Sequence, residues 1–172
     1  MDRKTEKLIT DCLKFSISKD ETRPNLNGVY FDPKAENAVS TNGYIMTYSR
    51  HKYDDALKDR IIDFKDMRVI KREFLKYEAA IPKVFAKSEL VNIRKDLVVK
   101  QRRVTVKAYY VSGKGFVLSE TELEEYEFAI NPEFLKPLVG YALVMEYSRP
   151  LQPIRFTLVD QDSYYIVMPM KV

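Results

Sequence analysis

The sequence has few of the residues on which catalytic and metal sites most often depend. Its 172 residues include one cysteine, Cys12, and one histidine, His51. A single cysteine excludes an internal disulfide and a cysteine-based zinc site, and a single histidine excludes a pair of histidine ligands. A hydrolytic triad would have to use His51, which lies in a polar Ser-Arg-His-Lys stretch without a catalytic motif. We therefore predict no metal site, and we place Cys12 in the core because its neighbours at helical spacing are apolar.

Glycine and long apolar runs are also scarce. The five glycines form no Gly-rich phosphate-binding pattern, which excludes the Walker and dinucleotide-binding fingerprints. No apolar run approaches the ~18 residues that a membrane span needs, and residues 1–7 lack the apolar core of a signal peptide. We expect a cytoplasmic protein that is not an enzyme, needs no cofactor and has no membrane partner.

Acidic residues are the remaining source of acid–base chemistry. Six of them lie close together in the sequence: Glu120, Glu122, Glu124, Glu125, Glu127 and Glu133. A pair of these carboxylates could serve as general acid and general base. Charges that keep an exposed strand edge from pairing with another chain explain the group without catalysis, and we favour that interpretation.

The composition is that of a globular protein. Hydrophobic residues make up 45% of the chain and charged residues 31%. A chain of this length buries a substantial core and most simply forms one domain.

The first 50 residues predict one helix and three strands. Residues 4–17 place apolar side chains on one helical face and charged side chains, Lys4, Lys7, Asp11 and Lys14, on the opposite face. Strands are expected at 27–32, 36–41 and 44–50, with Asn42-Gly43 as a two-residue hairpin turn between the last two.

The middle of the chain is less regular. Residues 51–75 fit a short helix and an irregular connection, residues 77–82 a short strand, and residues 83–97 a helix. Two strands, 103–111 and 115–118, are expected to form a hairpin.

The last block repeats the pattern of the first. A strand at 126–130 is followed by Asn131 as N-cap, a proline at the first helical position and a helix at 133–142. Strands are expected at 143–147, 154–159 and 164–170. Pro169 cannot donate to a sheet ladder, so it marks either the end of an ordinary core strand or an edge at which Met168 and Met170 dock another chain.

Basic residues concentrate between 83 and 103. Seven stand there against two acidic residues, a local excess of +5 in a chain whose net charge is +4: Lys83, Lys87, Arg94, Lys95, Lys100, Arg102 and Arg103. Such an excess attracts phosphate without regard to sequence, although a solvated helix face explains it equally well.

Two stretches resemble one known family. The tail, Tyr164-Tyr-Ile-Val-Met-Pro-Met-Lys-Val172, resembles the C-terminal strand of bacterial sliding clamps, the β subunit of DNA polymerase III, whose chains end in a similar Val-Met-Pro-aliphatic run. Residues 20–31 and Ser40-Thr-Asn-Gly-Tyr-Ile-Met46 are similar to the clamp pattern of an aspartate, Arg-X-X-Leu-Asn-Gly, a hairpin and Thr-Asp-Gly-His-Arg-Leu. The matches cover residues 4–50 and 124–172.

The resemblance implies a fold. It is an α+β DNA-clamp-like domain in which two helices pack on antiparallel sheets. Residues 1–172 would form a single clamp-like domain with its core at 4–50 and 124–172, and residues 55–122 would be an insertion or a partly repeated helix-hairpin segment.

The resemblance also implies binding residues. Clamps surround double-stranded DNA with helices, so the DNA-binding set by analogy is Lys4, Lys7, Lys14, Lys83, Lys87, Arg94, Lys95, Arg102, Arg103 and Lys136. Clamps also hold DNA polymerases and other partners through an apolar peptide pocket, whose matching positions are Arg23, Leu26, Thr41, Gly43, Met46, Ile166 and Met168. Four apolar members of this pocket should be partly exposed: Leu26, Met46, Ile166 and Met168. The family's aspartate is Asn42 here and its His-Arg pair is Tyr44-Ile45, which changes the polarity of the pocket.

Two functions follow from the resemblance. The first is a processivity factor of DNA replication that binds DNA non-specifically, docks partner peptides and assembles as a homo-oligomer around DNA. The second is a non-encircling module that uses the clamp fold to bind or compete for replication proteins.

Overall fold

The computed structural model describes residues 3–50, 53–93, 107–111, 115–117, 128–148, 152–158 and 162–169. Packing divides the chain into two compact units. Unit 1 comprises Met1–Ala80 and Leu158–Tyr165, and unit 2 comprises Ile81–Thr157 and Ile166–Val172. The single domain inferred from the sequence stays a prediction.

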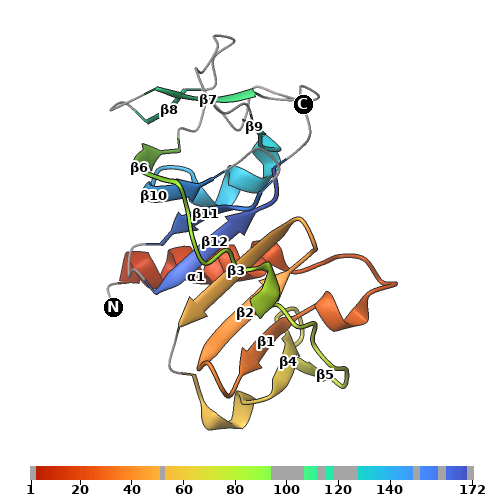
Figure 1. Ribbon diagram of the computed structural model, residues 1–172. Helices are drawn as coiled ribbons and strands as arrows, with labels where there is room; N and C mark the ends of the chain where they lie inside the picture. Colours follow the sequence, from red (N-terminus) through yellow and green to blue (C-terminus); the bar gives the residue numbers. More distant parts are fainter. Residues whose placement is uncertain are drawn as a thin grey trace. The chain divides into compact units, whose positions relative to one another are not determined.

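Unit 1 consists of one helix and an antiparallel sheet (Figure 1). The helix α1 spans Arg3–Ser16, close to its predicted range. The strands in chain order are β1 (Val29–Asp32), β2 (Asn37–Thr41), β3 (Ile45–Arg50), β4 (Arg60–Asp63), β5 (Arg68–Ile70) and the first residues of β12 (Ser163–Val167). Their order in the sheet is β5-β4-β1-β2-β3-β12, so the predicted meander of three strands is confirmed at its centre.

The sheet of unit 1 is covered on one face by α1. Ser40 Oγ donates to the Leu13 carbonyl at 2.8 Å, and Thr47 Oγ1 donates to the Cys12 carbonyl at 2.9 Å. Ser40 and Thr47 are cross-strand partners, so both point to the same face. The apolar side of the helix, including Cys12, is buried against this face, as its periodicity predicts.

The opposite face is covered by a segment that follows β5. Residues 72–78 cross this face, and the register places Tyr30, Val39 and Tyr48 side by side on it. Tyr77 from the segment packs against Tyr48, with ring centroids 6.2 Å apart. We call residues 72–78 the strap.

The turn between β2 and β3 differs by one residue from the prediction. Asn42 N donates to the Ile45 carbonyl, which makes Gly43 and Tyr44 the two central residues. Gly43 has φ +93°, as the first central position of a type II′ turn requires. Asn42 instead accepts hydrogen bonds from Tyr44 N and Ile45 N, at 2.9 and 3.0 Å.

Unit 2 contains two small sheets. The first has the order β11-β10-β6, with β6 at Lys87–Asn92, β10 at Ala142–Tyr147 and β11 at Ile154–Thr157. The second has the order β8-β7-β9, with β7 at Lys107–Val111, β8 at Gly115–Val117 and β9 at Phe128–Ala129. Both pairs of strands predicted at 103–118 and 143–159 are present where the chain is described.

Four predicted elements are wrong or incomplete. The helix expected at 83–97 is replaced by β6, in which Val91 is buried and its neighbour Leu90 is exposed, a period of two. The helix expected at 133–142 is a 3₁₀ helix, η4 (Pro132–Leu138), which contains a proline without an N–H to donate. The strand expected at 77–82 is a 3₁₀ turn, η3 (Glu78–Ala80). Residues 51–75 contain the short 3₁₀ helix η2 (Asp55–Leu57) and also the β4–β5 hairpin, which was not predicted.

The α+β class, with helical segments and antiparallel sheets, is confirmed. Within the described residues, no helix is both long and apolar enough to cross a membrane.

Candidate nucleic-acid interface and peptide pocket

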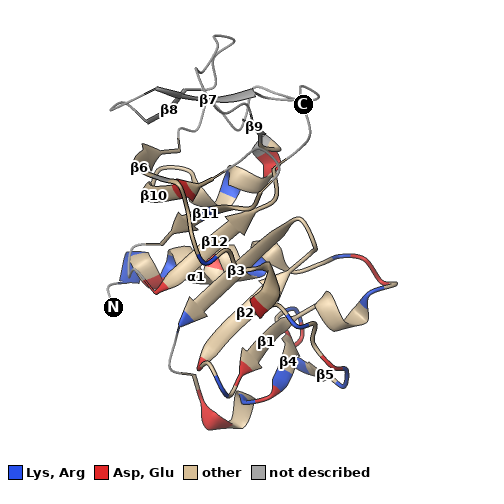
Figure 2. Cartoon of the chain, viewed as in Figure 1, with Lys and Arg blue, Asp and Glu red and all other residues tan. Residues whose placement is uncertain are grey.

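Helix α1 presents a basic face to solvent. Lys4, Lys7 and Lys14 are exposed, and their spacing of three and seven residues puts them on the side away from the sheet. Arg3 lies on the same side and was missed, although it stands four residues before Lys7. Asp11 shares this face, so its charge is mixed but positive in sum, and Figure 2 shows basic and acidic residues together on the helix.

The other predicted DNA-binding residues are less informative. Lys136 is exposed on η4 but forms an ion pair with Glu133. Lys83 is exposed, and Lys87 opens β6 rather than extending from a helix. Arg94, Lys95, Arg102 and Arg103 lie outside the described residues.

The loop between α1 and β1 is built around Asn27. When the side-chain amide nitrogen of Asn27 faces inward, that nitrogen lies 3.1 Å from each of three backbone carbonyl oxygens, those of Ser18, Asp20 and Arg23. This arrangement fixes the loop that carries Arg23 and Leu26, two members of the predicted peptide pocket. Arg23 is exposed and its Nε lies 3.2 Å from an Asp20 carboxylate oxygen. Hydrogen bonds from Thr22, and then the charge of Arg23, lower the pKa of Asp20.

The same unit brings Arg23 next to the β2–β3 turn. A Cβ atom on Gly43 would lie 3.5 Å from an Arg23 guanidinium nitrogen, so the two positions are neighbours. Thr41 is buried below them, where Oγ1 donates to the Ile45 carbonyl at 2.7 Å and accepts from Gly43 N at 3.1 Å. The structure therefore brings three predicted pocket residues of unit 1 together: Arg23, Thr41 and Gly43.

The apolar members of the predicted pocket are less open than expected. Leu26 and Met46 are each 5% exposed and Ile166 is 3% exposed, so the expectation of partial exposure is wrong for these three. Leu26 is buried in the 3₁₀ helix η1 (Pro24–Leu26), and Met46 and Ile166 lie in runs of consecutive buried residues in β3 and β12. Met168 is 38% exposed, as expected. Ile166 and Met168 belong to unit 2.

One exposed aromatic residue at this place was missed. Tyr44, the second central residue of the β2–β3 turn, is 62% exposed. Tyr44 stands where the clamp pattern has histidine. That departure from the pattern was the only sign in the sequence that this position differs.

Comparison with known structures shows which proteins share this fold. The chain superimposes on the β sliding clamp of Caulobacter crescentus with a TM-score of 0.74 and 17% identity, over 100% of this chain and 64% of the clamp. For the β subunit of DNA polymerase III from Bartonella birtlesii the TM-score is 0.74 with 20% identity, over 98% and 65% of the two chains. For the Helicobacter pylori β clamp it is 0.70 with 12% identity, over 95% and 63%.

The fold is that of bacterial sliding clamps. The resemblance seen in the sequence is thereby confirmed at the level of fold. No protein-family model matches the sequence, and no curated protein matches it. The chain spans about two thirds or less of each clamp, 63 to 65% of its length in these three structures.

Each of these three clamp structures holds a bound molecule. The Caulobacter clamp has PEG bound to it. The Bartonella clamp is bound to griselimycin, and the Helicobacter clamp is bound to a DNA ligase peptide.

Proposed function

We propose that this protein is a sliding-clamp-like factor of DNA replication that holds double-stranded DNA non-specifically and docks peptides of replication proteins. The observation that carries the proposal is the basic face of α1, set on a clamp fold. Lys4, Lys7 and Lys14 extend from a helix whose opposite side is buried, so all three can meet one ligand surface.

The expected DNA affinity is weak and depends on salt. Each lysine that neutralises a phosphate contributes a slope of about −0.9 to the logarithm of affinity against the logarithm of salt concentration. Three contacts on one helix therefore give a slope of about −3. A single copy would bind DNA only as weakly as other basic surfaces do. Tight retention on DNA would therefore require several copies that together surround it.

The test compares charge reversals on two faces of unit 1. K7E/K14E changes α1, and the matched control K65E/K71E makes the same change in charge at exposed lysines of the β4–β5 region. Retention on closed circular duplex DNA, measured against salt, should fall for K7E/K14E and stay near the wild-type value for K65E/K71E. Equal losses in both variants would mean that only net charge matters, and the α1 interface would be wrong.

Peptide docking is the second part of the proposal. In unit 1, the candidate residues are Arg23, Thr41 and Gly43. In unit 2, Met168 is the one exposed residue among the predicted apolar anchors, and it is tested by itself. The DNA ligase peptide seen on the Helicobacter clamp is a suitable probe. M168A should weaken its binding about tenfold, as expected when an apolar anchor is truncated. The matched control is M67A, a methionine that is 63% exposed on the β4–β5 turn. Equal affinity of the two variants would remove Met168 from the site.

The non-encircling module remains a second candidate because of length. The chain spans 63 to 65% of the clamps that it resembles, so a ring needs additional copies or another clamp. The mass of the protein in solution separates the two functions. A monomer at all concentrations, with peptide binding intact, would favour the module, and a stable oligomer would favour the factor that encircles DNA.

A further inference from the structure

A cavity of about 690 Å³ lies under the strap, on the face of unit 1 that α1 does not cover. Its walls are the strap, the β1–β2 turn and the residue before β4. It shares no residue with the basic face of α1 or with the predicted peptide pocket. The cavity is therefore a separate feature of the molecule.

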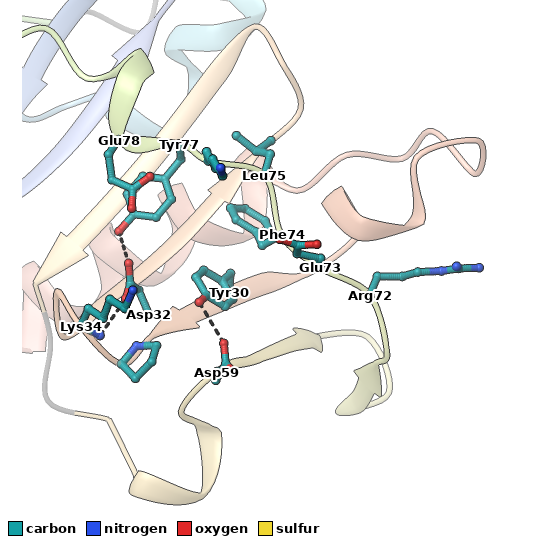
Figure 3. A pocket seen from close by; sticks show the side chains of 12 residues that line it. Tyr30, Asp32, Lys34, Asp59, Arg72, Glu73, Phe74, Leu75, Tyr77 and Glu78 are labelled. Carbon is teal, nitrogen blue, oxygen red and sulfur yellow. Dashed lines mark hydrogen bonds between the residues drawn. The ribbon is translucent and has the colours of Figure 1, made fainter.

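The centre of the cavity is aromatic (Figure 3). Tyr30 extends from β1 and stacks on Phe74 of the strap, with ring centroids 5.0 Å apart and planes 14° apart. Phe74 is 8% exposed and covers one face of the half-buried Tyr30, so a ligand reaches only the part of the Tyr30 ring that Phe74 leaves open. An aromatic face attracts cations and, above all, the planar guanidinium group.

A carboxylate lies beside this ring. Tyr30 Oη donates to Asp59 Oδ1 at 3.1 Å. Asp59 forms no ion pair with any residue that the structure describes, and a carboxylate accepts about four hydrogen bonds, so most of its capacity remains. Burial, and then the hydrogen bond to Asp59, raise the pKa of Tyr30, so the phenol stays a neutral donor.

The same chain shows how such a pair of groups is used. In unit 2, Arg155 donates from Nε and Nη2 to the two carboxylate oxygens of Glu146, at 2.7 and 2.9 Å. Its guanidinium carbon lies 4.4 Å from the centre of the Phe85 ring. One arginine thus pairs with a carboxylate and covers an aromatic face at once. Tyr30 and Asp59 offer these two partners in the cavity.

We propose that the cavity under the strap binds an arginine side chain of a protein partner, with its guanidinium group on the Tyr30 ring and paired with Asp59. The site would hold a partner on the sheet face of unit 1, independently of DNA and of the peptide pocket.

The charges around the cavity agree with a cationic guest. Its lining includes four carboxylates and three basic side chains, those of Lys34, Arg72 and Lys76. Figure 3 shows the Arg72 side chain extending away from the other lining residues, whereas Lys34 lies beside Asp32 and Tyr30 lies beside Asp59. An anionic guest would be repelled by the Asp59 carboxylate, which is exposed to solvent when no guest is bound.

The test uses the whole protein and three short peptides. Acetyl-Gly-Arg-Gly-amide is the probe, and its citrulline and lysine analogues remove the charge or the planar group. Binding is followed by protein NMR, through the amide signals of Tyr30, Asp59 and Phe74. Stacking on Tyr30 should also shift the δ-methylene protons of the arginine upfield, which an ion pair alone does not do.

Asp59→Asn is the decisive variant. Asp59 has φ +57°, a conformation that asparagine adopts readily, so the substitution keeps the turn. D59N should weaken the arginine peptide by about three- to fivefold, the loss expected when an ion pair of an exposed carboxylate is removed. The matched control is D66N, which removes an exposed carboxylate on the β4–β5 turn outside the cavity, and it should change affinity less than twofold.

Several results would overturn the proposal. These are equal affinity for the arginine and citrulline peptides, equal affinity for the arginine and lysine peptides, and equal losses in D59N and D66N. Peptide-induced NMR shifts confined to amides of residues outside the cavity would also contradict the proposal. The DNA and peptide measurements on α1 and Met168 do not depend on any of these outcomes.

Discussion

Replacing Tyr77 by phenylalanine removes one hydroxyl group from the interior of unit 1. Tyr77 is 2% exposed and Asp32 is 6% exposed. Tyr77 Oη donates to Asp32 Oδ2 at 2.7 Å, which ties the strap to β1. Burial, and then this hydrogen bond, raise the pKa of Tyr77, so the hydroxyl remains a donor at neutral pH. The substitution leaves a buried carboxylate oxygen without that donor.

The expected loss follows from the two partners. A hydrogen bond to a charged group contributes about 1.5 to 3 kcal/mol to stability. Asp32 Oδ1 still accepts from Lys34 N and Ala35 N at 2.8 and 3.2 Å, so the carboxylate stays anchored. We therefore expect the free energy of unfolding to fall by about 2 kcal/mol, which lowers the thermal midpoint by about 4 to 8 °C for a chain of this size.

Urea unfolding followed by circular dichroism measures this loss. The matched control is Tyr48→Phe, because Tyr48 also packs on this face, 5.8 Å from Tyr164, and its hydroxyl bonds to no other described residue. Y48F should change the free energy of unfolding by less than about 0.5 kcal/mol. If Y77F and Y48F cost the same, the strap is held by ring packing and the hydrogen bond contributes nothing.

Three further predictions test the fold, the predicted pocket and the Glu146–Arg155 ion pair. Gly28→Ala should destabilise by about 1 to 3 kcal/mol, because its Cβ would lie 2.6 Å from the Ile62 carbonyl oxygen, and an unchanged denaturation midpoint would contradict that contact. Ile166→Ala should lower the free energy of unfolding by about 2 to 5 kcal/mol and Met168→Ala by less than about 1 kcal/mol, because Ile166 is 3% exposed and Met168 is 38% exposed. A larger loss for Met168→Ala would contradict our assignment of Ile166 to the core and Met168 to the surface. Partial burial opposes ionisation of Glu146, but the hydrogen bonds and charge of Arg155 and a hydrogen bond from Thr157 together outweigh it and lower the pKa of Glu146. The stability that Glu146 provides is therefore full above its ordinary pKa of 4.5 and is lost as pH falls through the lowered value. The difference in unfolding free energy between wild type and E146Q should therefore shrink with acidification, and a constant difference would argue against this contribution.

Much of the fold follows from local patterns. The face of α1 and the strands β1 to β3 are readable because helical and strand periods differ and each element has one buried side. Those signals are local and do not depend on which element covers the buried side. Asn131 was also readable, since it accepts from Glu133 N at 3.0 Å as an N-cap should.

The failures have physical causes that the sequence conceals. In residues 83–97 the apolar positions fit a helical face, yet Val91 pairs with Leu143 of β10, a partner far along the chain. That pairing selects strand over helix, and no local pattern reports it. The 3₁₀ geometry of η4 was in reach, because Pro137 stands in the middle of the expected helix.

The candidate sites also differ in how far the sequence predicts them. The lysines of α1 could be placed on one exposed face from the sequence because one helix carries them all, and their contact with DNA stays a prediction. The arginine-binding cavity was not foreseen, because Tyr30, Asp59 and Phe74 come from three separate segments and form no motif. Only the fold places a strap residue on a β1 side chain.

The two proposed binding surfaces lie on opposite faces of the same strands, and this makes them separable. Ser40 and Thr47 bond to α1 on one face, while Tyr30, Val39 and Tyr48 stand on the other, below the strap. Substitutions at distant sites without shared partners usually have additive effects. K7E/K14E should therefore reduce DNA retention without changing affinity for the arginine peptide, and D59N should do the reverse. If D59N also lowered DNA retention while D66N did not, the cavity would belong to the DNA-binding surface, and the assignment of a protein partner to it would be wrong.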